Sequence, residues 1–134
     1  MKPFVLVPKM LTLQGVFYPT GYAFLLFPDE QNANQAGAEL EAAGFDRQDI
    51  MLLSPEVILR EIGKIDGESD VALPSVGTEG ATVRKYVDLA REGHFALMVK
   101  APSDKDTQRV MAAVASLPFS YGQKYHILAM EDLE

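Results

Sequence analysis

Two stretches of the chain are apolar at every position. Residues 22–28 read YAFLLFP and residues 95–99 read FALMV. Because successive side chains of a β-strand point to opposite faces of a sheet, both faces of these strands carry apolar side chains. In an antiparallel sheet with one solvent-exposed face, the strands would instead alternate apolar and polar residues. The pattern therefore predicts two central strands in a sheet that is covered on both faces.

Helical patterns alternate with these strands. After the first strand, Asp29 is typical of a helix start, and apolar residues recur at helical spacing from 31 to 43. Gly44 is typical of a helix end. A second apolar run, IMLL at 50–53, predicts another strand.

The second half of the chain continues the alternation. Ser54 followed by proline predicts a helix start, and residues 66–80, rich in Gly, Pro and Ser, predict a loop. A third helix then runs to Gly93. After the second central strand we expect a helix over about 103–117, a turn at Tyr121 and Gly122, and a final strand over 125–130.

The chain has the length of a single domain, 134 residues. Residues 1–20 hold two short β-like runs and predict an extended N-terminal arm. Residues 21–134 predict one α+β domain with a helical insert at about 55–93.

An internal repeat indicates how the strands are arranged. When the chain is shifted by 74 positions, YAFLLFPDEQ lies over ALMVKAPSDK, and Pro28 meets Pro102 and Phe45 meets Phe119. Two such strand–helix units, each followed by a strand, are typical of a split βαβ pair. We therefore predict a ferredoxin-like α+β sandwich with a four- or five-stranded, mainly antiparallel sheet and a helical insertion between its halves. A flavodoxin-like parallel sheet is the alternative.

The sheet face that the repeat helices leave open must be covered by something else. Left bare, it would expose several hundred Å2 of apolar surface, and its burial at about 25 cal/mol per Å2 contributes several kcal/mol. The cover is either the inserted helices or a second copy of the chain. We expect both: inserted helices folded over the sheet edge, and a contact between two copies.

Composition limits the partners and the chemistry. With 19 acidic and 12 basic residues the net charge is −7, which disfavours nucleic acid and anionic membrane surfaces. No stretch has the roughly 20 apolar residues of a membrane helix. The chain has no cysteine, which excludes disulfides, thiolate nucleophiles and cysteine-ligated metals. We expect a cytoplasmic protein without a bound metal or cofactor.

The stretch PSVGTEGATVRK at 74–85 is the best candidate ligand site. Free N–H groups at a helix start, a hydroxyl and two cations could hold a phosphate or carboxylate. The candidate anion-binding residues are Gly77, Thr78, Gly80, Arg84 and Lys85. The stretch matches no Walker or Rossmann fingerprint, and a loop with ordinary helix capping is the alternative.

The histidines are the other candidates. His94 opens one strand and His126 lies near the start of the last predicted strand. Either could bind a ligand or transfer a proton, and the alternative is an ordinary polar residue at a strand end. No third metal ligand accompanies them. Ser54 and Ser120 have no base at a recognisable spacing, so no catalytic residue is predicted.

Three segments carry a resemblance to a known family. They are GYAFLLFPDEQNANQAGAELEAAGFDRQDIMLLSPE, YVDLAREGHFALMVKAPSDKDTQRVMAAV and SYGQKYHILAMEDL. Together, over roughly residues 21–133, they resemble the bacterial heat-induced general-stress-protein 17M-like domain and related small uncharacterised bacterial proteins. The resemblance implies a ferredoxin-like fold and a stress-linked role, and it transfers no catalytic residues. Some members carry a Gly-rich, membrane-like segment where this chain has a helical insert.

These observations favour a non-enzymatic, stress-associated domain that acts through self-association or by binding a protein partner. One alternative is a sensor of small anions or nucleotides that uses the residues around Gly77. A second is an enzyme of the dimeric α+β barrel type, with His94 or His126 as the base. Whether the chain is an enzyme stays open, and a non-enzymatic role is favoured.

Overall fold

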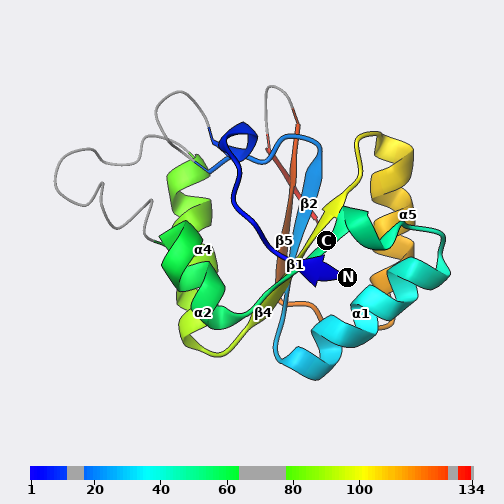
Figure 1. Cartoon of the computed structure of the whole chain (residues 1–134), viewed down its shortest axis with the longest axis horizontal. Helices are drawn as coiled ribbons and strands as arrows, with labels where there is room; N and C mark the ends of the chain where they lie inside the picture. The colour runs from blue at the N-terminus through cyan, green and yellow to red at the C-terminus, as the bar shows by residue number, and fades with distance from the viewer. Residues whose placement is uncertain (12–16, 64–77, 127–129, 134) are drawn as a thin grey trace, which may run out of the picture.

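The computed structural model describes residues 1–11, 17–63, 78–126 and 130–133 (Figure 1). The strands are β1 (Lys2–Pro3), β2 (Tyr22–Phe27), β3 (Ile50–Leu53), β4 (Phe95–Lys100), β5 (Tyr121–Tyr125) and β6 (Met130–Asp132). The helices are α1 (Glu30–Ala42), α2 (Pro55–Val57), α4 (Thr78–Arg91) and α5 (Asp104–Val114). A π-helical turn, η3 (Ile58–Gly63), continues α2, and two 3₁₀ turns lie at η1 (Pro8–Met10) and η2 (Arg47–Asp49).

The fold is α+β with a mixed, open, six-stranded sheet in the order β1-β3-β4-β2-β5-β6. Among the strands of the described residues, β1 pairs with β3 in parallel and the other four pairs are antiparallel. The α+β prediction is confirmed, and the flavodoxin-like parallel alternative is wrong. The predicted strand number of four or five is also wrong, because the N-terminal arm contributes β1 and a short β6 follows β5.

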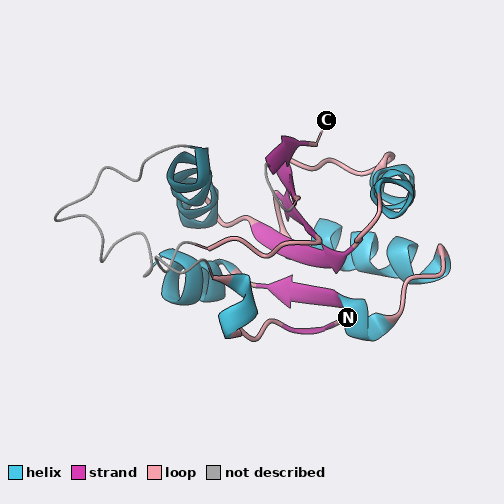
Figure 2. Cartoon of the chain, turned by 90° about the horizontal axis from the view of Figure 1, so that it is seen from above, coloured by secondary structure: helices cyan, strands magenta, loops and turns pink. Residues whose placement is uncertain are grey.

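Both faces of the sheet are covered within one chain. Figures 1 and 2 show α1 and α5 on one side of the sheet, and α2 and α4 on the other. In the central pair, Phe24 lies opposite Met98 and Leu25 opposite Leu97. Phe24 and Met98 join the cluster under α4, Leu25 and Leu97 join the cluster under α1 and α5, and all four are fully buried. The predicted double cover is confirmed, and the inserted helices lie on the face itself rather than over the sheet edge.

The N-terminal arm is part of this cover. Phe4, Met10 and Phe17 are buried in the same cluster as Phe24. The N–H of Phe4 donates to the carbonyl of Leu52 at 3.2 Å, which continues the contact of β1 with β3. The arm therefore supplies an edge strand and apolar side chains to the face under α4.

The predicted helix signals form the expected caps. The Asp29 side chain accepts a hydrogen bond from the N–H of Asn32 at the start of α1, and Ser54 and Ser103 cap α2 and α5 in the same way. Gly44 follows α1 with a φ of 103°, a conformation that glycine adopts without strain. Among the described residues, no helix is long and apolar enough to cross a membrane.

The end of the chain differs from the prediction. The turn expected at Tyr121 and Gly122 is the start of β5. The strand expected over 125–130 does not form as predicted, because β5 ends at Tyr125 and Met130 is the first residue of β6. Residues 127–129 lie outside the described residues. Strand β5 was misplaced because YGQKY has polar residues at strand positions. Their hydrogen-bond partners are brought close only in the folded chain.

Candidate functional site

Strand β5 is the most polar part of the sheet interior. It lies between β2 and β6, yet Gln123 is only 3% exposed and Lys124 only 1% exposed. Burying a polar side chain costs free energy unless it is hydrogen-bonded. The contacts of this strand therefore decide whether its polar groups serve the fold or a ligand.

On the face toward α4, β5 contributes to a cluster of tyrosines. The hydroxyls of Tyr86 and Tyr125 lie 2.7 Å apart and share a hydrogen bond. The ring of Tyr86 stacks on Phe24, with 4.0 Å between the ring centroids. All five tyrosines of the chain lie in this cluster or pack against it: Tyr18, Tyr22, Tyr86, Tyr121 and Tyr125. Gln123 donates from its amide to the hydroxyl of Tyr121 and to the carboxylate of Asp132.

Burial makes Tyr86 sensitive to high pH. Burial raises the pKa of Tyr86 well above its ordinary value, and the neighbouring Tyr125 raises it further. The folded chain therefore holds the phenol proton to a higher pH than the unfolded chain does. This contribution to stability is complete below about pH 10, where an unfolded tyrosine ionises, and is lost as the pH rises further.

We expect the denaturant midpoint of the wild-type chain to fall as the pH is raised above about 10. Tyr86→Phe should show a shallower fall, because its side chain has no proton to lose. Unfolding followed by circular dichroism at a series of alkaline pH values measures both slopes. Equal slopes in the two chains would contradict the role of Tyr86 in this fall.

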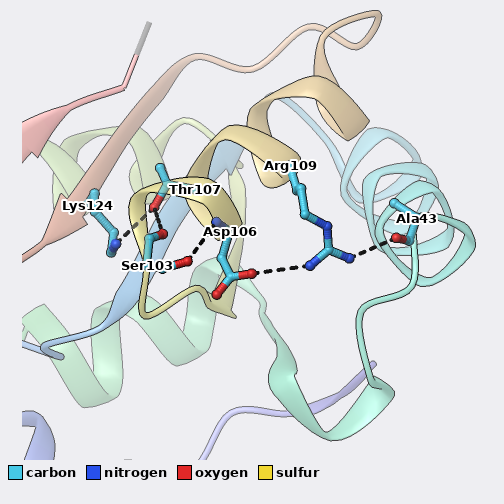
Figure 3. A network of polar contacts seen from close by, with 6 residues as sticks. All are labelled: Ala43, Ser103, Asp106, Thr107, Arg109 and Lys124. Atoms are coloured by element: carbon cyan, nitrogen blue, oxygen red, sulfur yellow. Dashed lines mark hydrogen bonds and ion pairs between the residues drawn. The ribbon is translucent and has the colours of Figure 1, made fainter.

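On the face toward α5, β5 buries a lysine. The Lys124 ammonium donates to the hydroxyl of Thr107 at 2.9 Å, and that hydroxyl donates to the carbonyl of Ser103 at 3.2 Å (Figure 3). No ion pair among the described residues includes Lys124. The ammonium of Lys124 thus lies under the first turn of α5 and donates to one neutral oxygen. Its hydrogen-bond partner and that of Thr107 both belong to the chain itself.

A second set of contacts in Figure 3 fastens α5 to the end of α1. Arg109 donates to the Asp106 carboxylate at 3.2 Å and to the carbonyl of Ala43 at 2.9 Å. Its guanidinium lies over the ring of Phe45, 4.4 Å from the centroid. Hydrogen bonds from Ser103, with a smaller contribution from Arg109, lower the pKa of Asp106. Arg109 therefore connects α5 to the end of α1, and Asp106 accepts a hydrogen bond from the same guanidinium.

The two candidate histidines are not brought together. The ring of His94 bonds to the carbonyl of Leu89 at 3.0 Å and to the hydroxyl of Ser120 at 2.8 Å. His126 bonds to the carboxylate of Glu131 at 2.9 Å. Ser120 precedes β5 and His126 follows it, so about 20 Å separates their positions at 3.3 Å per residue. The two histidines therefore do not share one site, and a ligand or proton-transfer role for either one stays a prediction.

The pairing of Ser120 with His94 is the feature that the sequence did not indicate. Ser120 lies 26 positions from His94, and no spacing rule links a serine before one strand to a histidine before another. The pair forms because β4 and β5 flank β2, so that both residues reach the same end of the sheet. Only the strand order could have indicated it.

The candidate anion site is described only in part. Helix α4 begins at Thr78, so Thr78 and Gly80 belong to the helix and not to the loop predicted over 66–80, and Gly77 lies outside the described residues. Gly80 is in the first turn, whereas Lys85 lies about 7.5 Å further along the helix axis at 1.5 Å per residue. The ammonium of Lys85 lies 5.8 Å from the centroid of the Tyr121 ring. Arg84 precedes it in the same turn, so the two cations do not belong to the first turn, and the anion site stays a prediction.

Within the described residues, no group of three His, Asp or Glu side chains could hold a metal ion. No buried side-chain nitrogen or oxygen there lacks a hydrogen-bond partner. No protein-family model matches the chain, and neither a curated protein nor a solved structure matches it. The resemblance to the general-stress-protein domain therefore stays a prediction.

Proposed function

We propose that the chain is a binding domain whose outer surface contacts another protein, rather than a domain that holds a ligand in its core. A ligand pocket presents converging polar groups that are free to meet the ligand. In the described core, Tyr86 bonds to Tyr125 and Lys124 bonds to Thr107. Because these buried polar groups bond to each other, they support binding at the outer surface rather than in the core. The stress-associated role and the cytoplasmic location stay predictions.

The sheet offers little to a second copy of the chain. Its faces are covered by the chain's own helices, so the arrangement of a dimeric α+β barrel enzyme has no open face among the described residues. Edge strand β1 contains Pro3, which has no N–H to donate. Edge strand β6 carries Glu131 and Asp132, whose charges would repel a second β6. A different protein is the partner that this geometry favours over a second copy.

The observation that carries the proposal is the outer surface of α1. No lysine or arginine occurs between Lys9 and Arg47. Acidic and amide side chains occupy the exposed positions of the first turns and the preceding cap: Asp29, Glu30, Gln31, Asn34 and Gln35. We call this set the α1 surface. The set carries two carboxylates, three neutral amides and no cation. Negative charge attracts a partner of the opposite sign and repels another copy of itself, so we propose a partner with a basic surface.

The arrangement of the central strands supports the ferredoxin-like plan as part of the same proposal. The parallel strands β2 and β3 are joined by α1 and separated by β4, and the parallel strands β4 and β5 are joined by α5 and separated by β2. This is a split βαβ pair. It places α1 and α5 together on one face and leaves their outer surfaces to solvent.

A cross-linking experiment tests the proposal. The chain has no cysteine, so Ala38→Cys, at an exposed position of α1, can carry a photoreactive group at one place only. Irradiation in an extract of the source cells should give one adduct of discrete mass. Ala112→Cys, exposed on α5, is the matched control and should give none. Equal adducts from both positions, or none from Ala38, would refute the α1 surface as the binding site.

A charge change tests whether the attraction is electrostatic. Gln31 and Asn34 are exposed, and substitution of exposed residues usually changes stability by less than about 0.5 kcal/mol. The double variant Gln31→Lys and Asn34→Lys, made in the Ala38→Cys chain, should lose the adduct and stay folded. Its unfolding midpoint should fall only slightly, because a cation near the N-terminus of a helix is unfavourable by about 0.3–1 kcal/mol. An undiminished adduct would show that the charge of α1 does not recruit the partner.

A further inference from the structure

His94 and Ser120 form a hydrogen-bonded pair at one end of the sheet. The distance from Nε2 of His94 to Oγ of Ser120 is 2.8 Å. The other ring nitrogen, Nδ1, lies 3.0 Å from the carbonyl oxygen of Leu89. A carbonyl can only accept a hydrogen bond, so Nδ1 carries the proton of the neutral ring and Nε2 presents its lone pair. The Ser120 hydroxyl therefore donates to a base.

The backbone holds both members of the pair in place. The N–H of His94 donates to the carbonyl of Leu89 at 3.1 Å, so this one oxygen fixes both the main chain and the ring of the histidine. The N–H of Ser120 donates to the carbonyl of Leu26 at 2.7 Å, at the end of β2. Ser120 is exposed and His94 is half-buried. A reagent can thus reach the serine while the base stays oriented behind it.

We propose that Ser120 is a nucleophile, with His94 as its general base, and that it accepts an acyl group from an activated ester such as a thioester or an aryl ester. Oγ of Ser120 attacks the carbonyl carbon of the ester while its proton passes to Nε2 of His94. The bond from that carbon to the leaving sulfur or oxygen breaks, and the leaving group takes the proton from Nε2. The products are an ester on Ser120, a free thiol or phenol, and a neutral His94.

The surroundings favour one acylation over rapid turnover. An acyl-transfer enzyme points free N–H groups at the oxygen that becomes negative. The backbone N–H groups of His94 and Ser120 already donate to the carbonyls of Leu89 and Leu26. The site is therefore an acceptor of a covalent group, which goes beyond the proposed binding function. A neutral ester also approaches a chain of net charge −7 more readily than a charged phosphoryl donor does.

The test uses p-nitrophenyl acetate and the full chain. We expect release of p-nitrophenolate and one acetyl group on Ser120, located by peptide mass spectrometry and removed by hydroxylamine, which cleaves esters and leaves amides. Exposed Ser116 in the same molecule is the internal control, and Ser120 should be acetylated much faster. This comparison needs no variant, so it holds whatever a substitution does to folding.

Variants then assign the base. Ser120→Ala should abolish the hydroxylamine-sensitive acetylation, and Ser116→Ala should leave it unchanged. His94→Gln, which keeps hydrogen-bonding groups but lacks the base, should slow it by about 100-fold, whereas His126→Gln should have no effect. Equal rates at Ser120 and Ser116, or an unchanged rate in His94→Gln, would overturn the proposal. Either result leaves the α1 surface untouched, because the two proposals concern different residues and different measurements.

Discussion

Replacing Tyr86 by alanine is expected to destabilise the chain by about 3–5 kcal/mol, the range for removing a large aromatic side chain from a core. Tyr86 is fully buried, stacks on Phe24 of the central strand β2 and bonds to Tyr125 of β5. Tyr86 therefore connects α4 to both strands. Its loss would leave a cavity between the helix and the sheet.

Two variants on the same helix calibrate this effect. Tyr86→Phe keeps the ring and removes only the hydrogen bond, so we expect a cost of about 1 kcal/mol. Asp88→Ala, at an exposed position, should change stability by less than about 0.5 kcal/mol. Urea unfolding of the three variants gives the comparison. If Tyr86→Ala cost no more than Asp88→Ala, α4 would not cover the sheet.

Replacing Thr107 by valine is expected to cost about 2–3 kcal/mol. Valine has nearly the shape of threonine, so the packing under α5 is retained. The change removes the oxygen that accepts the hydrogen bond from Lys124. A buried charged group that loses its partner costs more than a neutral one. The free energy of unfolding, measured in urea, gives the size of the effect.

Lys124→Met separates the charge from the packing. Methionine is apolar and nearly as long as lysine, and replacing a buried charge by an apolar side chain is often neutral or stabilising. We expect Lys124→Met to be no less stable than the wild type. Thr107→Val should then cost less in that background than alone. If the two changes were additive, Lys124 would not depend on the Thr107 hydroxyl.

The two central strands and their surrounding helices were predictable because each rests on a local pattern. YAFLLF and FALMV leave no polar side chain for solvent, and both stretches form central strands. The caps at Asp29 and Ser103 depend on one side chain and a backbone N–H three residues away. Such short-range interactions are visible in the sequence.

Strand β5 was misplaced because its stability depends on partners that are far away in the sequence. The sequence YGQKY places Gln123 and Lys124 where an apolar residue is expected. Lys124 is buried because Thr107, 17 positions earlier, accepts its hydrogen bond. The pairing of His94 with Ser120 has the same origin, since it follows from the strand order. Pattern reasoning has no access to contacts of this kind.

A contact between two copies was predicted because one apolar face of the sheet was expected to remain partly exposed in a single chain. The N-terminal arm supplies additional cover. Phe4, Met10 and Phe17 join the inserted helices over the face that holds Phe24. Self-association stays a prediction. The apolar sheet face that suggested it is covered by the chain's own residues and no longer supports it.

Denaturant unfolding at a series of protein concentrations tests most directly whether a single chain covers its own sheet. If the cover is internal, the midpoint and the slope of the transition should stay the same over about two orders of magnitude in concentration. A midpoint that rises with concentration would mean that a second copy completes the cover, and it would contradict a sheet that one chain covers on both faces.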